Sequence, residues 1–374
     1  MKSRPVWAEV DLGAIKNNVQ EIRRLVGQRT IMAVVKANAY GHGAFEVSKA
    51  CLAAGADRLA VAILNEGEYL RRRGIESAIM VLGWTPPEDY PRALENDIIL
   101  TIYNLKEAEE LNKIAARIGK TAKVHLKVDT GMGRIGFTFN DKNVNAVNQI
   151  LNLQNLFIEG IFTHFAKADE RDKSYTYLQL ERFIEFIAKV EKQSGYKFPI
   201  KHAANSAAII DIPDAHLDMV RPGIILYGLQ PSDQVNLAKI NLRAALSLKA
   251  RASRIERVPE GTSISYGGIF TTSRETILAA LPIGYADGYT RLLTGKGEVL
   301  YNSKRFPIIG KICMDQCMVD ITDSPQIRTD DDFILLGQNG NNCISADEIG
   351  EKLGTINYEV VCMISARVPR VYIE

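Results

Sequence analysis

The first 230 or so residues alternate short apolar, β-branched runs with longer segments of helical spacing, and this alternation limits the possible folds more than any other feature. Alternating strands and helices predict parallel strands joined by crossover helices, and about eight such units predict a closed barrel. An open doubly wound sheet fits the same periodicity, because periodicity does not show closure. The predicted strands lie at 31–36, 59–62, 78–82, 98–103, 122–128, 157–164, 200–203 and 219–221.

From about residue 240 the pattern changes to short strand-like segments separated by Gly, Pro, Asn and Asp. We therefore expect two domains, an α/β barrel over residues 1–240 and a mostly β domain over 241–374. The first ten or so residues are candidates to pair with the second domain. The predicted segments of that domain are strands at 246–256, 276–281, 297–301, 305–309, 317–321 and 332–336, and a helix at about 345–353.

The charge balance and the cysteines narrow the class of partner. Lys and Arg number 46 against 44 Asp and Glu, so the net charge of +2 favours neither nucleic acid nor an anionic membrane, and a small-molecule or protein partner is expected instead. The five cysteines form no C-x2-C pair, which predicts a reducing compartment and no metal site. The chain shows neither a signal core nor an apolar run of membrane-spanning length, so a cytoplasmic location is expected.

Ionisable and hydrogen-bonding side chains follow several of the predicted barrel strands. Taken singly, a lysine there is usually a surface charge, an arginine half of an ion pair, and a histidine a satisfied core residue. In a barrel, however, the carboxyl ends of the strands share one mouth, which would be cationic and suited to a phosphate or carboxylate. The residues concerned are Lys36, Lys127, Asp129, Arg134, His164, His202, Asn205, Ser206 and Arg221.

A glycine motif at 131–136 matches the dinucleotide fingerprint G-x-G-x-x-G, with Glu159 at about the distance of a ribose ligand. That fingerprint requires a helix to begin at the glycines. Here FTFND follows with no immediate helix, and Arg134 would crowd the phosphates. A dinucleotide site is therefore disfavoured.

Read together, nine segments resemble the alanine racemase family, whose members use pyridoxal 5'-phosphate (PLP) to interconvert L- and D-alanine. They run in order over nearly the whole chain, which begins with WAEVDL at 7–12. The segments are AVVKANAYGHG (33–43), KVDTGMGRIG (127–136), THF (163–165), HAANS (202–206), RPGI (221–224), ISYG (264–267), IGYADG (283–288), ICMDQ (312–316) and ARVPR (366–370).

The resemblance implies an eight-stranded barrel followed by a β-rich domain, a head-to-tail homodimer with shared active sites, and PLP as cofactor. Lys36 would form the Schiff base with PLP, and Arg221, supported by His202, would face its pyridine nitrogen. The implied cofactor-binding set is Lys36, Tyr40, His164, Asn205, Ser206, Arg221, Gly223, Ile224 and Tyr358.

For the substrate, the resemblance implies that Arg134 and the backbone of Met314 bind the carboxylate. Racemisation needs a base on each face of the amino acid. Lys36 would serve the D face, and Tyr266 from the partner subunit, backed by His164, would serve the L face. Further implied roles are a supporting, carbamylation-prone Lys127, a supporting Asp315, and a substrate-access corridor formed by Tyr285 and Arg291.

The expected function is supply of D-alanine for peptidoglycan, and three rival functions stay open. A related racemase would take serine or a broader set of amino acids. A non-catalytic PLP carrier resembles only the N-terminal half, so a second domain with Tyr266 separates it from a racemase. A barrel-plus-β decarboxylase would carry a Cys-Asp pair, which CMD at 313–315 echoes only superficially.

Overall fold

Eight parallel strands form the barrel within residues 4–374, the part of the chain that the computed structural model describes. Around the ring their order is β10-β2-β3-β4-β5-β6-β8-β9. Between β9 and β10 the backbone amides of Asp218 and Arg221 donate to the carbonyls of Lys201 and Ala204, at 3.1 and 3.0 Å. The strands are β2 (Thr30–Val34), β3 (Arg58–Val61), β4 (Ile79–Val81), β5 (Ile98–Ile102), β6 (Ala122–Asp129), β8 (Leu156–Phe162), β9 (Ile200–His202) and β10 (Met219–Val220).

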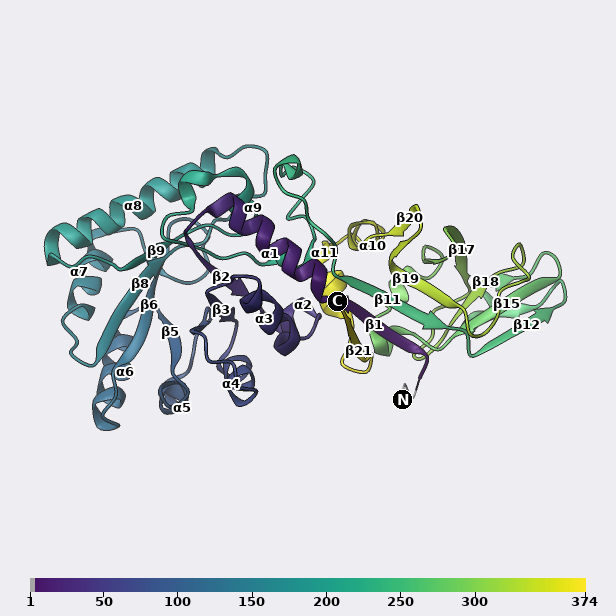
Figure 1. The fold of residues 1–374 in the computed structure, drawn as a ribbon, viewed down its shortest axis with the longest axis horizontal. Coiled ribbons are helices and arrows are strands. Elements are labelled where there is room, and N and C mark those ends of the chain that lie inside the picture. The colour runs from purple at the N-terminus through teal and green to yellow at the C-terminus, as the bar shows by residue number, and fades with distance from the viewer. Residues whose placement is uncertain (1–3) are drawn as a thin grey trace. The chain divides into compact units, whose positions relative to one another are not determined.

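Helices cover the outside of this barrel, as α4 to α8 show in Figure 1. Each presents an apolar stripe to the strands; in α1, for example, Ile15, Val19 and Ile22 are fully buried. Asn104 and Asn140 cap α6 and α7 by accepting a hydrogen bond from a backbone amide three residues on. The helices are α1 (Leu12–Val26), α3 (Ala44–Ala53), α4 (Leu64–Arg72), α5 (Tyr90–Glu95), α6 (Leu105–Arg117), α7 (Asp141–Ile150), α8 (Ser174–Ser194) and α9 (Ser206–Asp211).

The second compact unit, hereafter the β unit, combines the residues up to Gly13, Tyr40–Gly43 and Ala244–Glu374. Its main sheet has the order β12-β15-β18-β17-β16-β19-β11-β1-β21, and β20 pairs with β19. Its strands are β1 (Val6–Asp11), β11 (Leu246–Arg251), β12 (Arg254–Val258), β15 (Thr276–Leu281), β16 (Glu298–Tyr301), β17 (Lys304–Ile309), β18 (Cys317–Asp320), β19 (Asp332–Asn339), β20 (Asn342–Ile344) and β21 (Arg370–Ile373). A separate hairpin pairs β13 (Ser263–Ile264) with β14 (Phe270–Thr271), and the helices are α10 (Ala346–Leu353) and α11 (Asn357–Met363).

The predicted fold class, a barrel followed by a mostly β region, is confirmed. The prediction of one strand over 246–256 is wrong, because the chain changes partners there: β11 pairs with β1 and β19, whereas β12 pairs with β15. The periodicity also failed to indicate β13, β14, β20, β21 and α11, which are short or depend on distant partners. Within residues 4–374, no helix is both long and apolar enough to cross a membrane.

Candidate active site

The predicted strand-end residues lie where the barrel strands finish. Lys127 and Asp129 lie on β6, His202 ends β9, and Arg221 directly follows β10. Lys36 comes two residues after β2, and His164 two residues after β8. Lys127 and His164 are each coupled electrostatically to Lys36, Arg134 and Arg221. The barrel therefore gathers these four cations and His164 into one cluster, hereafter the mouth cluster.

Lys36 begins a strained turn, α2 (Lys36–Tyr40). Ala37, Asn38 and Ala39 have φ values of 52°, 54° and 54°, a left-handed conformation that costs roughly 1–2 kcal/mol per non-glycine residue. The carboxylate of Glu66 supports the turn, because it accepts hydrogen bonds from the Ala37 amide at 2.6 Å and the Ala62 amide at 2.8 Å. Strain of this kind persists where the surroundings hold it and is common at functional positions. Glu66 was not among the predicted site residues.

Arg221 is the most buried cation of the mouth cluster, with 3% of its surface exposed. Its guanidinium donates to His202 Nδ1 at 2.9 Å and to the carbonyl oxygens of Thr163 at 2.7 Å and Ala203 at 2.9 Å. It also lies 5.3 Å from the centre of the Phe162 ring. Burial lowers the pKa of Arg221 to about 9, so the group stays protonated at neutral pH. The acceptors found for it in residues 4–374 are neutral, and its charge therefore suits an electron-rich ligand atom.

Lys127 is a buried lysine with a strongly altered pKa. Burial, followed by the charges of Arg134 and Arg221, lowers this pKa to about 7, and Asp129 opposes the shift only in part. The ammonium lies 5.2 Å from the centre of the Phe162 ring. The neutral amine of Lys127 is therefore accessible near neutral pH, which is unusual for a lysine.

The glycine motif at 131–136 is built around Asp129. Its carboxylate accepts hydrogen bonds from the amides of Gly131, Met132, Gly133 and Arg134, at 2.9–3.1 Å. The short strand β7 (Phe137–Thr138) follows the motif, and the next helix begins only at Asp141. The amides that a nucleotide phosphate would need are thus occupied, in agreement with the rejection of the dinucleotide fingerprint.

Hydroxyl and amide groups gather after β9 and β10. Asn205 caps α9 by accepting from the Ala208 amide at 3.1 Å, and Ser206 Oγ accepts from the Gly223 amide at 2.9 Å. Ile224 begins the 3-10 turn that follows Gly223. Backbone amides and a serine hydroxyl at helix starts are the donors that phosphate groups bind in proteins.

Two predicted cofactor tyrosines lie in the β unit. The rings of Tyr40 and Tyr358 have centres 6.2 Å apart and planes at 50°. Burial, with smaller contributions from Tyr358 and Cys362, raises the pKa of Tyr40 far above its usual range. The Tyr40 phenol therefore keeps its proton and can act as a hydrogen-bond donor.

The other predicted residues of the β unit lie on exposed turns. Tyr266 is 69% exposed and follows Ser265, whose φ of 62° is held by a hydrogen bond from its hydroxyl to the Lys311 carbonyl at 2.6 Å. The amide of Tyr285 donates to the Cys313 carbonyl at 3.1 Å, which ties the Tyr285 turn to the 313–315 segment. Met314 is 52% exposed. Arg291 begins a further 3-10 turn, and Asp315 pairs with Arg367 at 2.7 Å.

A buried glutamine is a second residue that sequence reasoning missed. Gln179 on α8 is fully buried, accepts from the Ala166 amide at 2.8 Å and donates to the His164 carbonyl at 3.2 Å. It therefore holds the backbone that carries His164. Its only signal in the sequence was a polar residue on an apolar helix face. Residues 4–374 contain no group of three or more His, Cys, Asp or Glu side chains arranged to hold a metal.

A barrel with a cationic mouth, a strained lysine turn and a separate β unit defines the class as an α/β-barrel enzyme that handles an anionic small molecule. Matches to protein-family models define the class more narrowly. The N-terminal domain of alanine racemase matches residues 10–231, and its C-terminal domain matches residues 245–372. The chain therefore belongs to the alanine racemase family and is an amino-acid racemase.

Individual relatives agree over the full length. An alanine racemase of Methanococcus maripaludis is 53% identical, and the match covers 100% of both chains. The structure of an alanine racemase from Clostridium difficile is 44% identical, with a TM-score of 0.96 over 100% of this chain and 97% of that one. An alanine racemase from Bacillus anthracis with bound L-Ala-P is 42% identical, with a TM-score of 0.94 over 100% and 96%.

Proposed function

We propose that the protein interconverts L- and D-alanine with PLP as cofactor, acting in the cytoplasm to supply D-alanine for peptidoglycan. The observation that carries the proposal is the mouth cluster, where Lys36 on its strained turn is grouped with the buried Arg221 and Lys127. The family supports alanine as substrate and implies PLP.

The residues of the chain fit PLP in the chemistry of their donors. An amine is needed to carry the cofactor, and Lys36 supplies it at the barrel mouth. Phosphate needs hydroxyl and amide donors, and the proposed set is Tyr40, Ser206, the backbone of Gly223 and Ile224, and Tyr358, with Asn205 capping α9 beside it. When bound, PLP withdraws electrons from the substrate α-carbon and so allows its proton to leave.

Arg221 would face the pyridine nitrogen of the cofactor. A guanidinium with a pKa of about 9 does not give up its proton at neutral pH, so Arg221 would donate a hydrogen bond to the pyridine nitrogen without protonating it. That arrangement would make the ring a weaker electron sink than one whose nitrogen faces a carboxylate and is protonated. Prompt return of the proton to the α-carbon is thereby favoured over transamination.

Two bases would exchange the α-proton, Lys36 on the D face and Tyr266 of the partner subunit on the L face. One base removes the proton, and the other then gives its own proton to the opposite face. The phenol needs a neighbouring donor to ionise. His164 is suited to this, because Arg221 donates to its Nδ1 at 3.4 Å, which leaves the proton on Nε2. Burial and Arg221 also lower the pKa of His164, so its ring is neutral.

The substrate carboxylate would bind Arg134 and the backbone of Met314, with Asp315 in support. Arg134 is exposed at the barrel mouth, and Met314 lies on the turn bonded to the Tyr285 loop. Tyr285 and Arg291 would line the access corridor and restrict the side chain to about the size of a methyl group.

Lys127 would act as a carbamate. Only a neutral amine reacts with CO2, forming a C–N bond and releasing one proton, and the pKa of about 7 makes this form available. The product carries a negative charge in place of a positive one. It would therefore orient Arg134 and relieve the repulsion among the cations of the mouth cluster.

The proposed homodimer accounts for exposed apolar side chains on the β unit. Tyr266, Ile269, Leu292 and Met314 are each more than half exposed, and a partner subunit that covered them would remove apolar surface from water. If a partner barrel covers this surface, Tyr266 becomes part of that barrel's active site.

Isotope exchange tests the reaction and the substrate together. The PLP-loaded protein is incubated in D2O with L-alanine, D-alanine and, separately, serine and larger amino acids, and both α-proton loss and inversion are followed. We expect exchange and inversion of both alanine enantiomers, and slower exchange of larger substrates. Cofactor-loaded protein that exchanges neither alanine enantiomer would refute the proposal.

Subunit mixing tests the shared site. Lys36→Ala and Tyr266→Phe proteins should each be inactive in racemisation. A mixture of equal amounts should regain about one quarter of the intact sites, because half of the dimers are mixed and each mixed dimer has one complete site. No recovery after verified subunit exchange would mean that the two bases come from the same chain.

A further inference from the structure

Five side chains form a continuous hydrogen-bonded line through the barrel. Arg58 on β3 donates to Glu159 Oε2 at 2.5 Å, and the same oxygen lies 2.8 Å from His125 Nε2. His125 Nδ1 lies 2.8 Å from His202 Nε2, and His202 Nδ1 lies 2.9 Å from Arg221 Nη1. The line thus joins the predicted site residues His202 and Arg221 to Glu159, the residue that a dinucleotide fingerprint would have assigned to a ribose.

The chemistry of the two ends fixes the direction of the line. A guanidinium can only donate, so His202 Nδ1 must accept from Arg221, and the His202 proton lies on Nε2. That Nε2–H then donates to His125 Nδ1, which places the His125 proton on Nε2 as well. The Nε2–H of His125 finally donates to the carboxylate of Glu159. Each histidine is neutral and has one permitted tautomer.

Burial and charge agree with this assignment. Both histidines are fully buried, whereas the side chains of Glu159 and Arg58 are 15% and 21% exposed. Burial lowers the pKa of His125, and burial together with Arg221 lowers that of His202, so both rings are neutral at pH 7. Burial alone would raise the pKa of Glu159, but hydrogen bonds from His125 and Arg58 outweigh it and lower the pKa to about 2.

The surrounding strands are shaped to hold the line. Gly160 lies opposite His125 in the register of β6 and β8, and a Cβ at this glycine would lie 2.5 Å from both Nδ1 and Cε1 of the ring. Only glycine leaves room for His125 at this point. The His202 ring is stacked on Phe162, with centres 4.8 Å apart and planes at 10°. Neither imidazole can therefore turn over without moving a neighbour.

We propose that His125 and Glu159 are positioning residues for Arg221: they hold His202 in the Nε2–H tautomer, so that its Nδ1 can only accept from the guanidinium. Without an acceptor at His125, the buried Nε2–H of His202 would lose its partner, and only the contact with Arg221 would still oppose the Nδ1–H tautomer, in which two N–H groups face each other. Arg221 would then lose one of its fixed contacts and turn away from the ligand atom it faces. This effect on catalysis rests on the proposed function, whereas the tautomers do not.

The first test reads the tautomers directly. The full-length protein, labelled with ¹⁵N-histidine, is examined by NMR with and without PLP, and resonances are assigned with single His→Asn variants. We expect His125 and His202 to be neutral with the proton on Nε2 at pH 7. A proton on Nδ1 of either ring, or a charged ring, would overturn the proposal whether or not the protein racemises alanine.

Two substitutions at one position separate positioning from packing. In His125→Asn the amide oxygen can occupy the place of Nδ1 and accept from His202, whereas His125→Gln keeps a donor toward Glu159 and loses that acceptor. We expect the Gln variant to shift His202 to the Nδ1–H tautomer and to lower kcat about 10-fold or more, since a wrong tautomer disables an ordered site. The Asn variant should keep the tautomer and most of the kcat. Equal losses in both would contradict the proposal.

Glu159→Gln covers the case in which neither His125 variant folds. It keeps one acceptor oxygen and the shape of the side chain, removes the charge and replaces the other oxygen with an NH2 donor, so we expect a shifted His125 Nε2–H resonance and a lower kcat with little change in KM for alanine. Glu191→Gln is the matched control, because Glu191 is 11% exposed and paired with Lys197 and Lys201 outside the line. Equal effects of the two substitutions on kcat would overturn a role for Glu159.

Discussion

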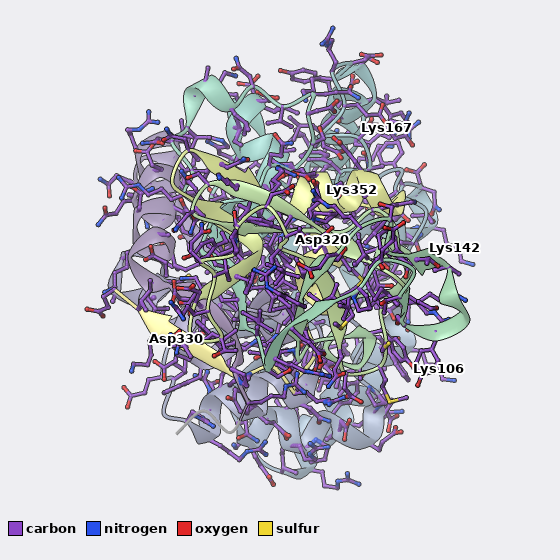
Figure 2. All side chains as sticks on the ribbon, turned by 90° about the vertical axis from the view of Figure 1, so that its right-hand side faces the viewer. Lys106, Lys142, Lys167, Asp320, Asp330 and Lys352 are labelled. Atoms are coloured by element: carbon purple, nitrogen blue, oxygen red, sulfur yellow. The ribbon has the colours of Figure 1, made fainter. Side chains whose placement is uncertain are left out.

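At the barrel mouth the coupled side chains are mainly cations, whereas a cluster in the β unit alternates cations with anions. The mouth cluster joins Lys36, Lys127, Arg134 and Arg221. In the β unit, Arg305 and Lys352 alternate with Glu298 and Glu348 through four ion pairs of 2.6–3.0 Å. Lys352 lies on α10 and is labelled in Figure 2.

The pKa values of the cationic side chains are lowered at the mouth and raised in the β-unit cluster. At the mouth, burial lowers the pKa of Lys127 to about 7 and that of Arg221 to about 9. In the β unit, Glu348 raises the pKa of Arg305, and hydrogen bonds from Arg305 and then Lys352 lower the pKa of Glu348 to about 2. The β-unit cluster neutralises itself and contributes to stability. At the mouth, Asp129 opposes the pKa shift of Lys127 only in part, so positive charge predominates there, and a bound anion would neutralise it.

The two regions should differ most in how the loss of a lysine affects racemase activity. Lys36→Ala should abolish racemisation of both alanine enantiomers, a loss of at least about 10³-fold, because a base and the cofactor attachment disappear together. Lys352→Ala in the β-unit cluster should retain activity within about 2-fold. Isotope exchange with purified, PLP-saturated proteins measures both. Substantial exchange by Lys36→Ala would contradict the assignment of that base.

The second prediction concerns Lys127 and pH. The amine reacts with CO2 only when neutral, so carbamylation is present above a pKa of about 7 and is lost as the pH falls below it. Lys127→Ala should lower kcat about 10²-fold. Lys123→Ala, on the same strand but exposed and paired with Asp97 at 3.2 Å, should not. A ¹³C signal from labelled CO2 that is present in wild type and absent in Lys127→Ala would support the carbamate; an identical signal in both would exclude it.

The third prediction concerns the stability that the β-unit cluster contributes. Arg305→Met removes two hydrogen bonds to Glu348, one to Glu298 and one to the Cys343 carbonyl, and should lower the free energy of unfolding by about 2 kcal/mol. Urea titration followed by circular dichroism measures this change, and racemisation should remain. Arg274→Met breaks an exposed pair with Asp323 and should cost less than about 0.5 kcal/mol. Similar costs for the two substitutions would show that the cluster adds nothing beyond isolated surface pairs.

The smallest expected effect is a loss, at acid pH, of the stability that Glu348 contributes in the same cluster. The folded pKa of Glu348, about 2, lies below its ordinary value of 4.5. The group therefore contributes stability above about pH 5 that is lost as the pH falls toward 2. Because solvent screens the pair, Glu348→Gln should cost only about 1 kcal/mol at pH 7. Urea midpoints at pH 7 and pH 3 test this, and a cost that did not shrink at pH 3 would contradict it.

Much of the fold followed from periodicity. The eight barrel strands were predicted within a few residues, because buried parallel strands are continuous apolar runs and the helices between them carry one apolar stripe. The β unit was less predictable. Its strand β1 pairs with β11 and β21, more than two hundred residues away, and no local pattern indicates such partners.

Some site residues could likewise be predicted from the sequence, and others could not. Lys36, Lys127 and Arg221 could be proposed because strand ends converge in a barrel. Glu66 and Gln179 could not be proposed in this way. Each accepts a hydrogen bond from a backbone amide that lies many residues away in the sequence and comes close only in the folded chain. A polar residue on a helix gives no local sign of which amide it will bind.

The sequence by itself determined the number of barrel units, the residue types at the strand ends and the family, because these depend on composition, spacing and motif order. Tertiary structure decided the protonation of those residues. A lysine has the same ordinary pKa wherever it stands in a sequence, and only burial beside Arg134 and Arg221 brings that of Lys127 to about 7. Likewise, only the line of contacts from Arg58 to Arg221 assigns a single proton position to each histidine between them.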